Sequence, residues 1–173
     1  MPYLRANTDA PFGAMPYDGV KRVTPYNKVA GYATRISIGD FVVLASDGNV
    51  NVAAAGDTNV LGVAAMSSPA STANLEFLVY DDPAQLFTCQ ADDGGTALVQ
   101  SNVGNNCDII ATAFNADTGR SNHEIDQSTA VTTTAQVRIV GLHPIEAGTF
   151  GANRKYIIRI QEHILGQAGT AGI

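Results

Sequence analysis

Short apolar runs separated by turn residues recur along the chain from residue 36 onward. Residues 41–44 (FVVL) are continuously apolar, residues 49–52 alternate asparagine with valine, and residues 60–64 (VLGVA) are apolar again. The residues at 47–49 (DGN) are typical of a tight hairpin turn. Because the segment 39–66 is too short to hold a crossover helix between these strands, it predicts an antiparallel meander.

The same pattern predicts further short strands downstream and one helical turn. In residues 155–163, Tyr156, Ile158 and Ile160 fall on one face of the strand, because side chains alternate along a strand. Residues 96–102 (TALVQSN) are the segment that favours a helical turn. The other expected strands are residues 75–80, 85–90, 107–112 and 135–143.

Residues 1–34 differ in composition from the rest of the chain. They hold four of the seven prolines and four of the six tyrosines, and proline at this density prevents a helix and favours extended chain. We interpret the segment as an extended N-terminal arm that docks on a partner by adding a strand to it. The alternative is an N-terminal strand that covers its own domain. On the first interpretation, removing residues 1–25 leaves a folded body.

Together these features predict a mainly β protein. We expect a compact antiparallel β-barrel or sandwich of eight to ten short strands, with an extended N-terminal arm and one short helix. Glycine (17) and threonine (15) are frequent, whereas lysine (3) and glutamate (4) are rare, which argues against a helical bundle. The expected divisions are the arm at 1–34, the β-barrel body at 35–165 and a flexible tail at 166–173.

The charge distribution excludes several classes of partner. The net charge is −6, which excludes a general nucleic-acid binder because such proteins need a basic face. Residues 1–35 carry +3, residues 36–137 carry −11 and residues 138–173 carry +2. No apolar run approaches the roughly 18 residues of a membrane span, and no signal peptide is expected. We therefore expect neither nucleic acid nor a membrane as a partner.

The sequence contains no recognisable catalytic or metal-binding motif. His123, His143 and His163 lack metal-ligand spacing, and we expect them on the surface or at strand ends. Residues 47–51 resemble the start of a calcium loop but lack its glycine and its final glutamate, so we expect a hairpin turn. A P-loop, a dinucleotide fingerprint and a nucleophile elbow are also missing. We predict no enzymatic activity, no cofactor and no metal site.

Acid pairs and cysteines leave two alternatives open. The acid pairs at 81–82 and 92–93 are expected as exposed turn residues, with a loose cation site as the alternative. Cys89 and Cys107 belong to no C-x-x-C motif. We expect two reduced, packed thiols there, with a single disulfide as the alternative.

One pattern within the predicted meander resembles a known family. Residues 39–50 read G-D-x-V-x-L-x-x-D-G-x-V and are followed by V-L-G-V-A at 60–64. This pattern resembles the barrel signature of head decoration proteins of tailed bacteriophages, also called cement or capsid-stabilising proteins. The segments APFG (10–13), QVRIVGL (136–142) and GANRKYIIRIQEHIL (151–165) are similar to phage virion structural proteins of this size.

The resemblance implies a structural role without catalysis. It implies a small β protein that joins the outside of an assembled icosahedral capsid, often as trimers, after synthesis in the host cytoplasm. The expected partners are the major capsid protein and further copies of this chain in a homotrimer. Another virion role, such as a tail, vertex knob or host-adhesion module, is the first alternative. A small β-barrel enzyme or ligand-binding module is the second.

Two sets of residues are candidates for these contacts. Aromatic residues and prolines of the N-terminal segment supply buried area and rigidity for capsid binding. Basic residues near the C-terminus can face acids of neighbouring subunits. The capsid-binding candidates are Pro11, Phe12, Tyr17, Pro25, Tyr26 and Tyr32, and the subunit-interface candidates are Arg138, Arg154, Lys155 and Arg159.

Overall fold

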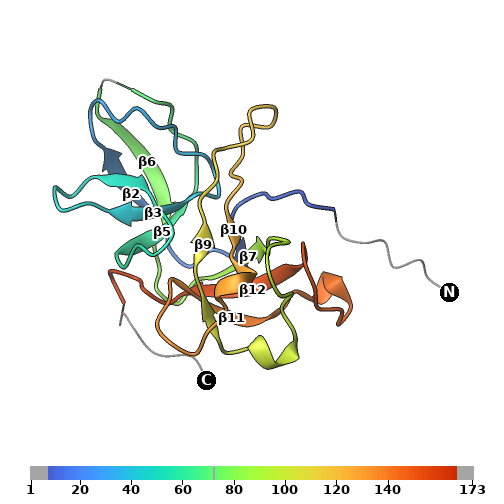
Figure 1. Ribbon diagram of the computed structural model, residues 1–173. Helices are drawn as coiled ribbons and strands as arrows, with labels where there is room; N and C mark the ends of the chain where they lie inside the picture. The colour runs from blue at the N-terminus through green and yellow to red at the C-terminus, as the bar shows by residue number, and fades with distance from the viewer. Residues whose placement is uncertain (1–7, 72, 167–173) are drawn as a thin grey trace.

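Two five-stranded antiparallel sheets and a two-stranded ribbon make up the fold (Figure 1). The computed structural model describes residues 8–71 and 73–166. One sheet, sheet A, has the order β1-β7-β12-β11-β8, and the other, sheet B, has the order β2-β6-β5-β3-β4. The ribbon pairs β9 with β10.

The strands of sheet A are β1 (Met15–Tyr17), β7 (Leu86–Gln90), β8 (Asn106–Cys107), β11 (Val137–Leu142) and β12 (Lys155–Ile160). Those of sheet B are β2 (Thr24–Lys28), β3 (Phe41–Leu44), β4 (Val50–Val52), β5 (Val60–Ala64) and β6 (Leu75–Tyr80), and the ribbon comprises β9 (Ile109–Ile110) and β10 (Glu124–Ile125).

The main hydrophobic core joins the two sheets and the ribbon. Phe41 and Val63 of sheet B, Tyr156 and Ile158 of sheet A and Ile125 of the ribbon all belong to this one buried cluster. The mainly β prediction is therefore confirmed, and the architecture is a sandwich. Of the two expected architectures, barrel and sandwich, the barrel is not found, because each sheet ends in edge strands and neither closes on itself.

Sheet B is buried on both faces at its inner strands, β3 and β5. Its second face carries a smaller cluster with Val42, Leu61 and Phe77 at its centre, covered by chain that includes Ile36 and Tyr32. This double burial explains the continuous apolar runs at 41–44 and 60–64, since neither face of those strands meets water. The predicted meander is confirmed as β4, β3 and β5 of sheet B.

The N-terminal segment is part of the sandwich. β1 pairs with β7 at the edge of sheet A, and β2 pairs with β6 at the edge of sheet B. The prediction that strands begin only at residue 36 is wrong, because the proline in each of these strands lies at a sheet edge, where a missing N–H is tolerated. Residues 8–34 thus follow the alternative interpretation, in which the segment covers its own domain.

A close backbone crossing fixes the start of this segment. The Ala14 N–H donates to the Gly39 carbonyl at 2.9 Å. Gly13 has a φ of +74°, and a Cβ at this position would lie 2.4 Å from the Gly39 oxygen. Residues 12–14 therefore pack directly on the loop that enters β3.

Most remaining elements follow the predicted pattern, with two corrections. The late strands β11 and β12 are confirmed, and Tyr156, Ile158 and Ile160 are all buried. The expected helical turn at 96–102 is reduced to a three-residue 3-10 turn, Gln100–Asn102. The strand expected at 107–112 is split between β8 in sheet A and β9 in the ribbon. The tail at 167–173 lies outside the described residues.

Candidate functional site

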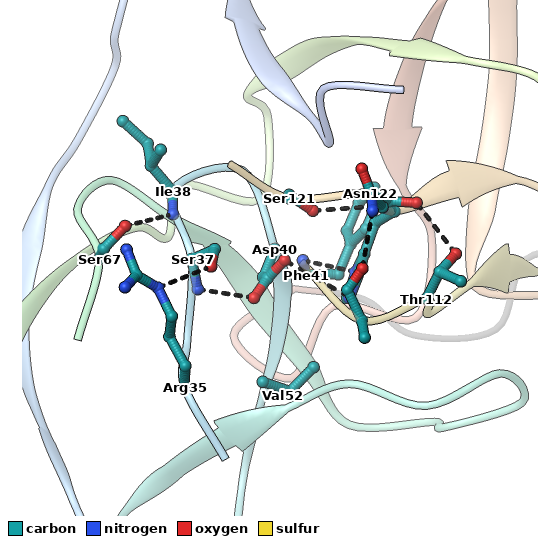
Figure 2. A network of polar contacts seen from close by, with 12 residues as sticks. Arg35, Ser37, Ile38, Asp40, Phe41, Val52, Ser67, Thr112, Ser121 and Asn122 are labelled. Carbon is teal, nitrogen blue, oxygen red and sulfur yellow. Dashed lines mark hydrogen bonds and ion pairs between the residues drawn. The ribbon is translucent and has the colours of Figure 1, made fainter. Parts of the chain in front are cut away.

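A cavity of about 430 Å³ between the loop entering β3 and the ribbon loop holds the densest group of chemically active side chains. Its polar floor includes Asp40 and His123, and its apolar wall includes Val52 and Phe114. Arg35 also lines it. Figure 2 shows Asp40, Ser37 and Arg35 gathered on one side of this site, with Thr112 and Asn122 on the other.

Asp40 is held at the floor by its own loop. The Ser37 N–H donates to Asp40 Oδ2 at 2.7 Å, and the Asp40 N–H donates to the Ser37 carbonyl at 3.0 Å (Figure 2). Asp40 Oδ1 is buried and accepts no hydrogen bond from the described residues. The carboxylate is therefore fixed through one oxygen, while the other faces His123.

His123 links the ribbon to sheet B. Its Nδ1 accepts a hydrogen bond from the Phe41 N–H at 3.2 Å, so the neutral ring carries its proton on Nε2. Nε2 lies 3.5 Å from Asp40 Oδ1, and the ring stacks on Phe41 at a centroid distance of 6.1 Å. Burial lowers the pKa of His123, although the Asp40 charge acts in the opposite direction. The imidazole is consequently neutral at pH 7.

The rim of the cavity is built by a cation–aromatic contact. The Arg35 guanidinium lies over the Phe114 ring at 5.1 Å. Arg35 also donates from Nε to Ser37 Oγ at 3.2 Å and from Nη2 to the Gly119 carbonyl at 3.4 Å. These contacts hold the ribbon loop against the loop that carries Asp40.

The Asp40–His123 pair acts as a structural clamp in this geometry. A general base needs a free imidazole nitrogen near a nucleophile, but Nδ1 is occupied by a backbone N–H and Nε2 faces a carboxylate. The nearby Ser121 hydroxyl accepts from the backbone N–H of His123 and not from its ring. Within residues 8–71 and 73–166, no three His, Cys, Asp or Glu side chains are grouped to hold a metal ion.

His123 and His143 lie at strand ends, as expected, next to β10 and β11. The expected surface exposure needs correction for two histidines and for one acid pair. His123 and His163 are buried, with exposures of 1% and 2%, and only His143 is partly exposed. Asp81, expected as an exposed turn acid, is also buried. The hairpin turn at 47–49 is confirmed by the Asn49 N–H, which donates to Asp47 Oδ1 at 3.0 Å. Both cysteines are buried and neither forms a disulfide, as expected.

Asp81 anchors the N-terminal segment to the end of β6. Its Oδ1 accepts from Arg22 Nε at 2.9 Å and from the Thr24 hydroxyl at 3.0 Å, and its Oδ2 accepts from the Tyr26 hydroxyl at 2.8 Å. Gln85 provides a second anchor. Its amide oxygen accepts from the Lys21 N–H, and its amide nitrogen donates to the carbonyls of Tyr17 and Gly19. Neither anchor could be recognised from local sequence, because the partners of Asp81 and Gln85 in this segment lie 55 or more residues away in the chain.

The six candidate arm residues belong to this anchored segment. Tyr26 and Tyr32 pack against the smaller core cluster of sheet B, and the Tyr32 hydroxyl accepts from the Val52 N–H. Tyr17 contacts His143 edge-on at 5.4 Å. Pro11 and Phe12 are partly buried, whereas Pro25 is exposed.

The four interface candidates differ in their partners. Arg154 bonds the buried Glu146 at 3.0 Å, and Lys155 Nζ lies 3.8 Å from the same carboxylate. Arg138 donates from Nε to Asn106 Oδ1 at 3.0 Å. Arg159 donates to the Gln161 amide oxygen at 3.3 Å. Arg154 and Lys155 thus contact a buried carboxylate, whereas Arg138 and Arg159 donate hydrogen bonds to side-chain amides.

Comparison with known proteins does not identify a family. Searches against protein-family models and against curated proteins find no match for this chain. Among the described residues, the structure has no helix with the length and apolar character to traverse a bilayer.

Proposed function

We propose that this protein is a structural virion component that decorates the outer surface of an icosahedral bacteriophage capsid and stabilises it. The pattern at 39–64 that resembles decoration proteins forms the centre of sheet B. The similar segments at 136–142 and 151–165 contribute the central pair of sheet A. The resemblance therefore covers the framework of the fold, and the proposed partner is the major capsid protein.

An uncovered apolar strip beside an edge strand is the observation that carries the proposal. Leu78 of β6 lies directly opposite Pro25 of β2, and Val23 precedes β2 on the same face by strand alternation. Leu78 and Val23 have exposures of 39% and 37%, and Pro25 is exposed. An apolar strip that ends at an open strand edge is suited to strand addition by another subunit.

Buried polar side chains support a role in reinforcing a larger structure. Gln90 accepts from the Ala10 N–H and donates to the Thr8 and Asn153 carbonyls. Gln136 joins residues 54, 56 and 109 in the same manner. Because each amide fixes loop backbone far away in sequence, the long connections are held to the sandwich, which suits a protein that reinforces a shell.

We propose that the protein acts as a trimer on the shell. Residues 36–137 carry −11, so copies in contact need apolar or basic patches at their interfaces. Arg159 on sheet A is the basic candidate, because its hydrogen bond goes to the neutral Gln161, whereas Arg154 and Lys155 contact Glu146.

Co-sedimentation with undecorated capsids tests the proposal. The wild-type protein is expected to sediment with the shells in hundreds of copies per particle, whereas a tail or vertex component would bind in about a dozen copies. Leu78→Glu should abolish binding, because it places a charge on the apolar strip. Val99→Glu is the matched control, since Val99 is 51% exposed and lies outside the strip. Full decoration by a folded Leu78→Glu variant would disprove the role of this surface, and no binding by the wild type would disprove the function.

A ligand-binding module is the second candidate function. The cavity floored by Asp40 and His123 is the feature that favours it. Asp40→Asn would then weaken the binding of a small polar ligand and leave capsid sedimentation unchanged. A screen of small ligands by thermal shift separates the two functions, because decoration requires no stabilising ligand.

A further inference from the structure

Two arginines lie directly opposite each other on the outer face of sheet A. Arg138 of β11 pairs in register with Arg159 of β12. Like charges in this position destabilise a sheet unless a counter-charge lies between or beside them. Arg159 forms no ion pair with any carboxylate of residues 8–71 or 73–166, and its hydrogen bond goes to the neutral Gln161.

A cavity of about 310 Å³ opens beside Arg159 at the end of β12. Its polar side chains are those of Arg159, Gln161 and His163, and Pro83 and Ala84 form part of its wall. The Gln161 oxygen is occupied by Arg159, which leaves the amide NH2 as the available group. Among residues 8–71 and 73–166, no carboxylate side chain lines this cavity.

His163 forms part of the wall of the same cavity. Its Nδ1 accepts from the Leu165 N–H at 3.1 Å, so the ring proton is on Nε2. Nε2 is buried and has no hydrogen-bond partner among the described residues. The carboxylate of Asp81 lies in this region but is already bonded to Arg22, Thr24 and Tyr26. Because Nε2 is enclosed, His163 serves as a wall of the cavity and not as one of its donors.

We propose that this cavity binds a carboxylate group through Arg159 and Gln161, beside the His163 ring. A guanidinium presents two parallel N–H groups that match the two oxygens of a carboxylate, and the Gln161 amide provides a further donor. The carboxylate belongs either to a small free acid or to an Asp or Glu side chain of another protein. The proposal does not depend on the virion function.

Titration of the ¹⁵N-labelled full-length protein with sodium propionate tests the site. The His163 and Gln161 side-chain resonances should shift and saturate with a Kd below about 100 mM, at constant ionic strength. Propionamide, the neutral molecule of nearly the same shape, should give no saturable shift. Equal responses to propionate and propionamide, or no saturation by propionate, would overturn the proposal without any variant being needed.

Two variants test the role of the guanidinium. Arg159→Gln should weaken propionate binding about 10- to 100-fold, because it removes a charge-assisted contact. Arg120→Gln, on an exposed loop away from the cavity, is the matched control and should bind as the wild type does. Unchanged binding by a folded Arg159→Gln variant would contradict the proposal.

A second pair of probes separates the two sources of the carboxylate. N-acetylglutamate amide presents the group on a protein-like side chain, and N-acetylglutamine amide is its neutral control. Binding of the glutamate derivative with the affinity of propionate would identify an acidic side chain as a ligand. Binding of propionate alone would restrict the site to small free acids.

Discussion

Replacing Asp81 with alanine should destabilise the fold by releasing the N-terminal segment. The carboxylate is buried and accepts hydrogen bonds from Arg22, Thr24 and Tyr26. These three donors lie in or just before β2, the edge strand of sheet B. The variant therefore removes the side chain that ties this strand to the end of β6.

The magnitude follows from the individual contacts. A hydrogen bond to a charged group contributes about 1.5–3 kcal/mol. Arg22 is 45% exposed, so solvent screens its ion pair and its contribution is left out. The bonds from Thr24 and Tyr26 are partly buried and contribute about 1–2 kcal/mol each. The expected loss is therefore about 2–4 kcal/mol, a large part of the roughly 5–15 kcal/mol that typically stabilises a domain.

The same contacts give the effect a pH dependence. Burial alone would raise the pKa of Asp81, but the hydrogen bonds from Arg22, Tyr26 and Thr24 outweigh it and lower the pKa below its ordinary value. A carboxyl with a lowered pKa in the folded state stabilises the protein above its unfolded pKa of about 3.9. This contribution is lost as the pH falls below that value, so the difference between wild type and Asp81→Ala should shrink in acid.

Urea unfolding at pH 7 and pH 3 measures both effects. The neighbouring Asp82→Ala is the control, since Asp82 makes only a local bond to the Ala84 N–H among the described residues. Hydrogen exchange should show faster opening of β2 in Asp81→Ala. If the two variants differ by less than 1 kcal/mol at pH 7, or if β2 exchanges as in the wild type, the reasoning is wrong.

Three further predictions address other parts of the fold. Gly13→Ala should destabilise the fold by about 2–3 kcal/mol more than Gly19→Ala, as measured by thermal unfolding. Both glycines have a positive φ, but of the two only Gly13 lacks space for a Cβ. Equal losses of stability would contradict the close packing at Gly13. Burial and the charges of nearby acids raise the pKa of Glu124 to about 7, so its charge costs stability as the pH rises from about 4.5 through 7; Glu124→Gln should stabilise by about 1–2 kcal/mol at pH 8 and by nothing at pH 4, as measured by urea unfolding. Deleting residues 1–25 should prevent folding, contrary to the expectation from sequence, and a cooperative thermal transition of the truncated protein would show otherwise.

The strands that could be predicted are those in which burial imposes a local pattern of apolar residues. The runs at 41–44 and 60–64 are apolar because β3 and β5 are buried on both faces, and alternation marks β12 because one of its faces is buried. β1 and β2 were missed because Pro16 and Pro25 suggest an arm when read locally. Only the tertiary position at a sheet edge makes those prolines compatible with strands.

The candidate site could not be predicted from local patterns. Asp40 and His123 lie more than 80 residues apart and meet because the ribbon folds onto the entrance of β3. Nothing in the neighbourhood of either residue encodes that contact. The same holds for Gln85, whose amide completes the hydrogen bonding of an irregular segment elsewhere in the chain.

The position of the first two strands also determines when the protein can fold during synthesis. Met15 pairs with Thr88, and Thr24 pairs with Val79. The ribosome must therefore release the middle of the chain before either strand finds its place. At 5–20 residues per second, that delay is roughly 3–15 s. During this time the N-terminal segment is without its partners, so recombinant yield should respond to translation speed and to chaperones that bind nascent chains.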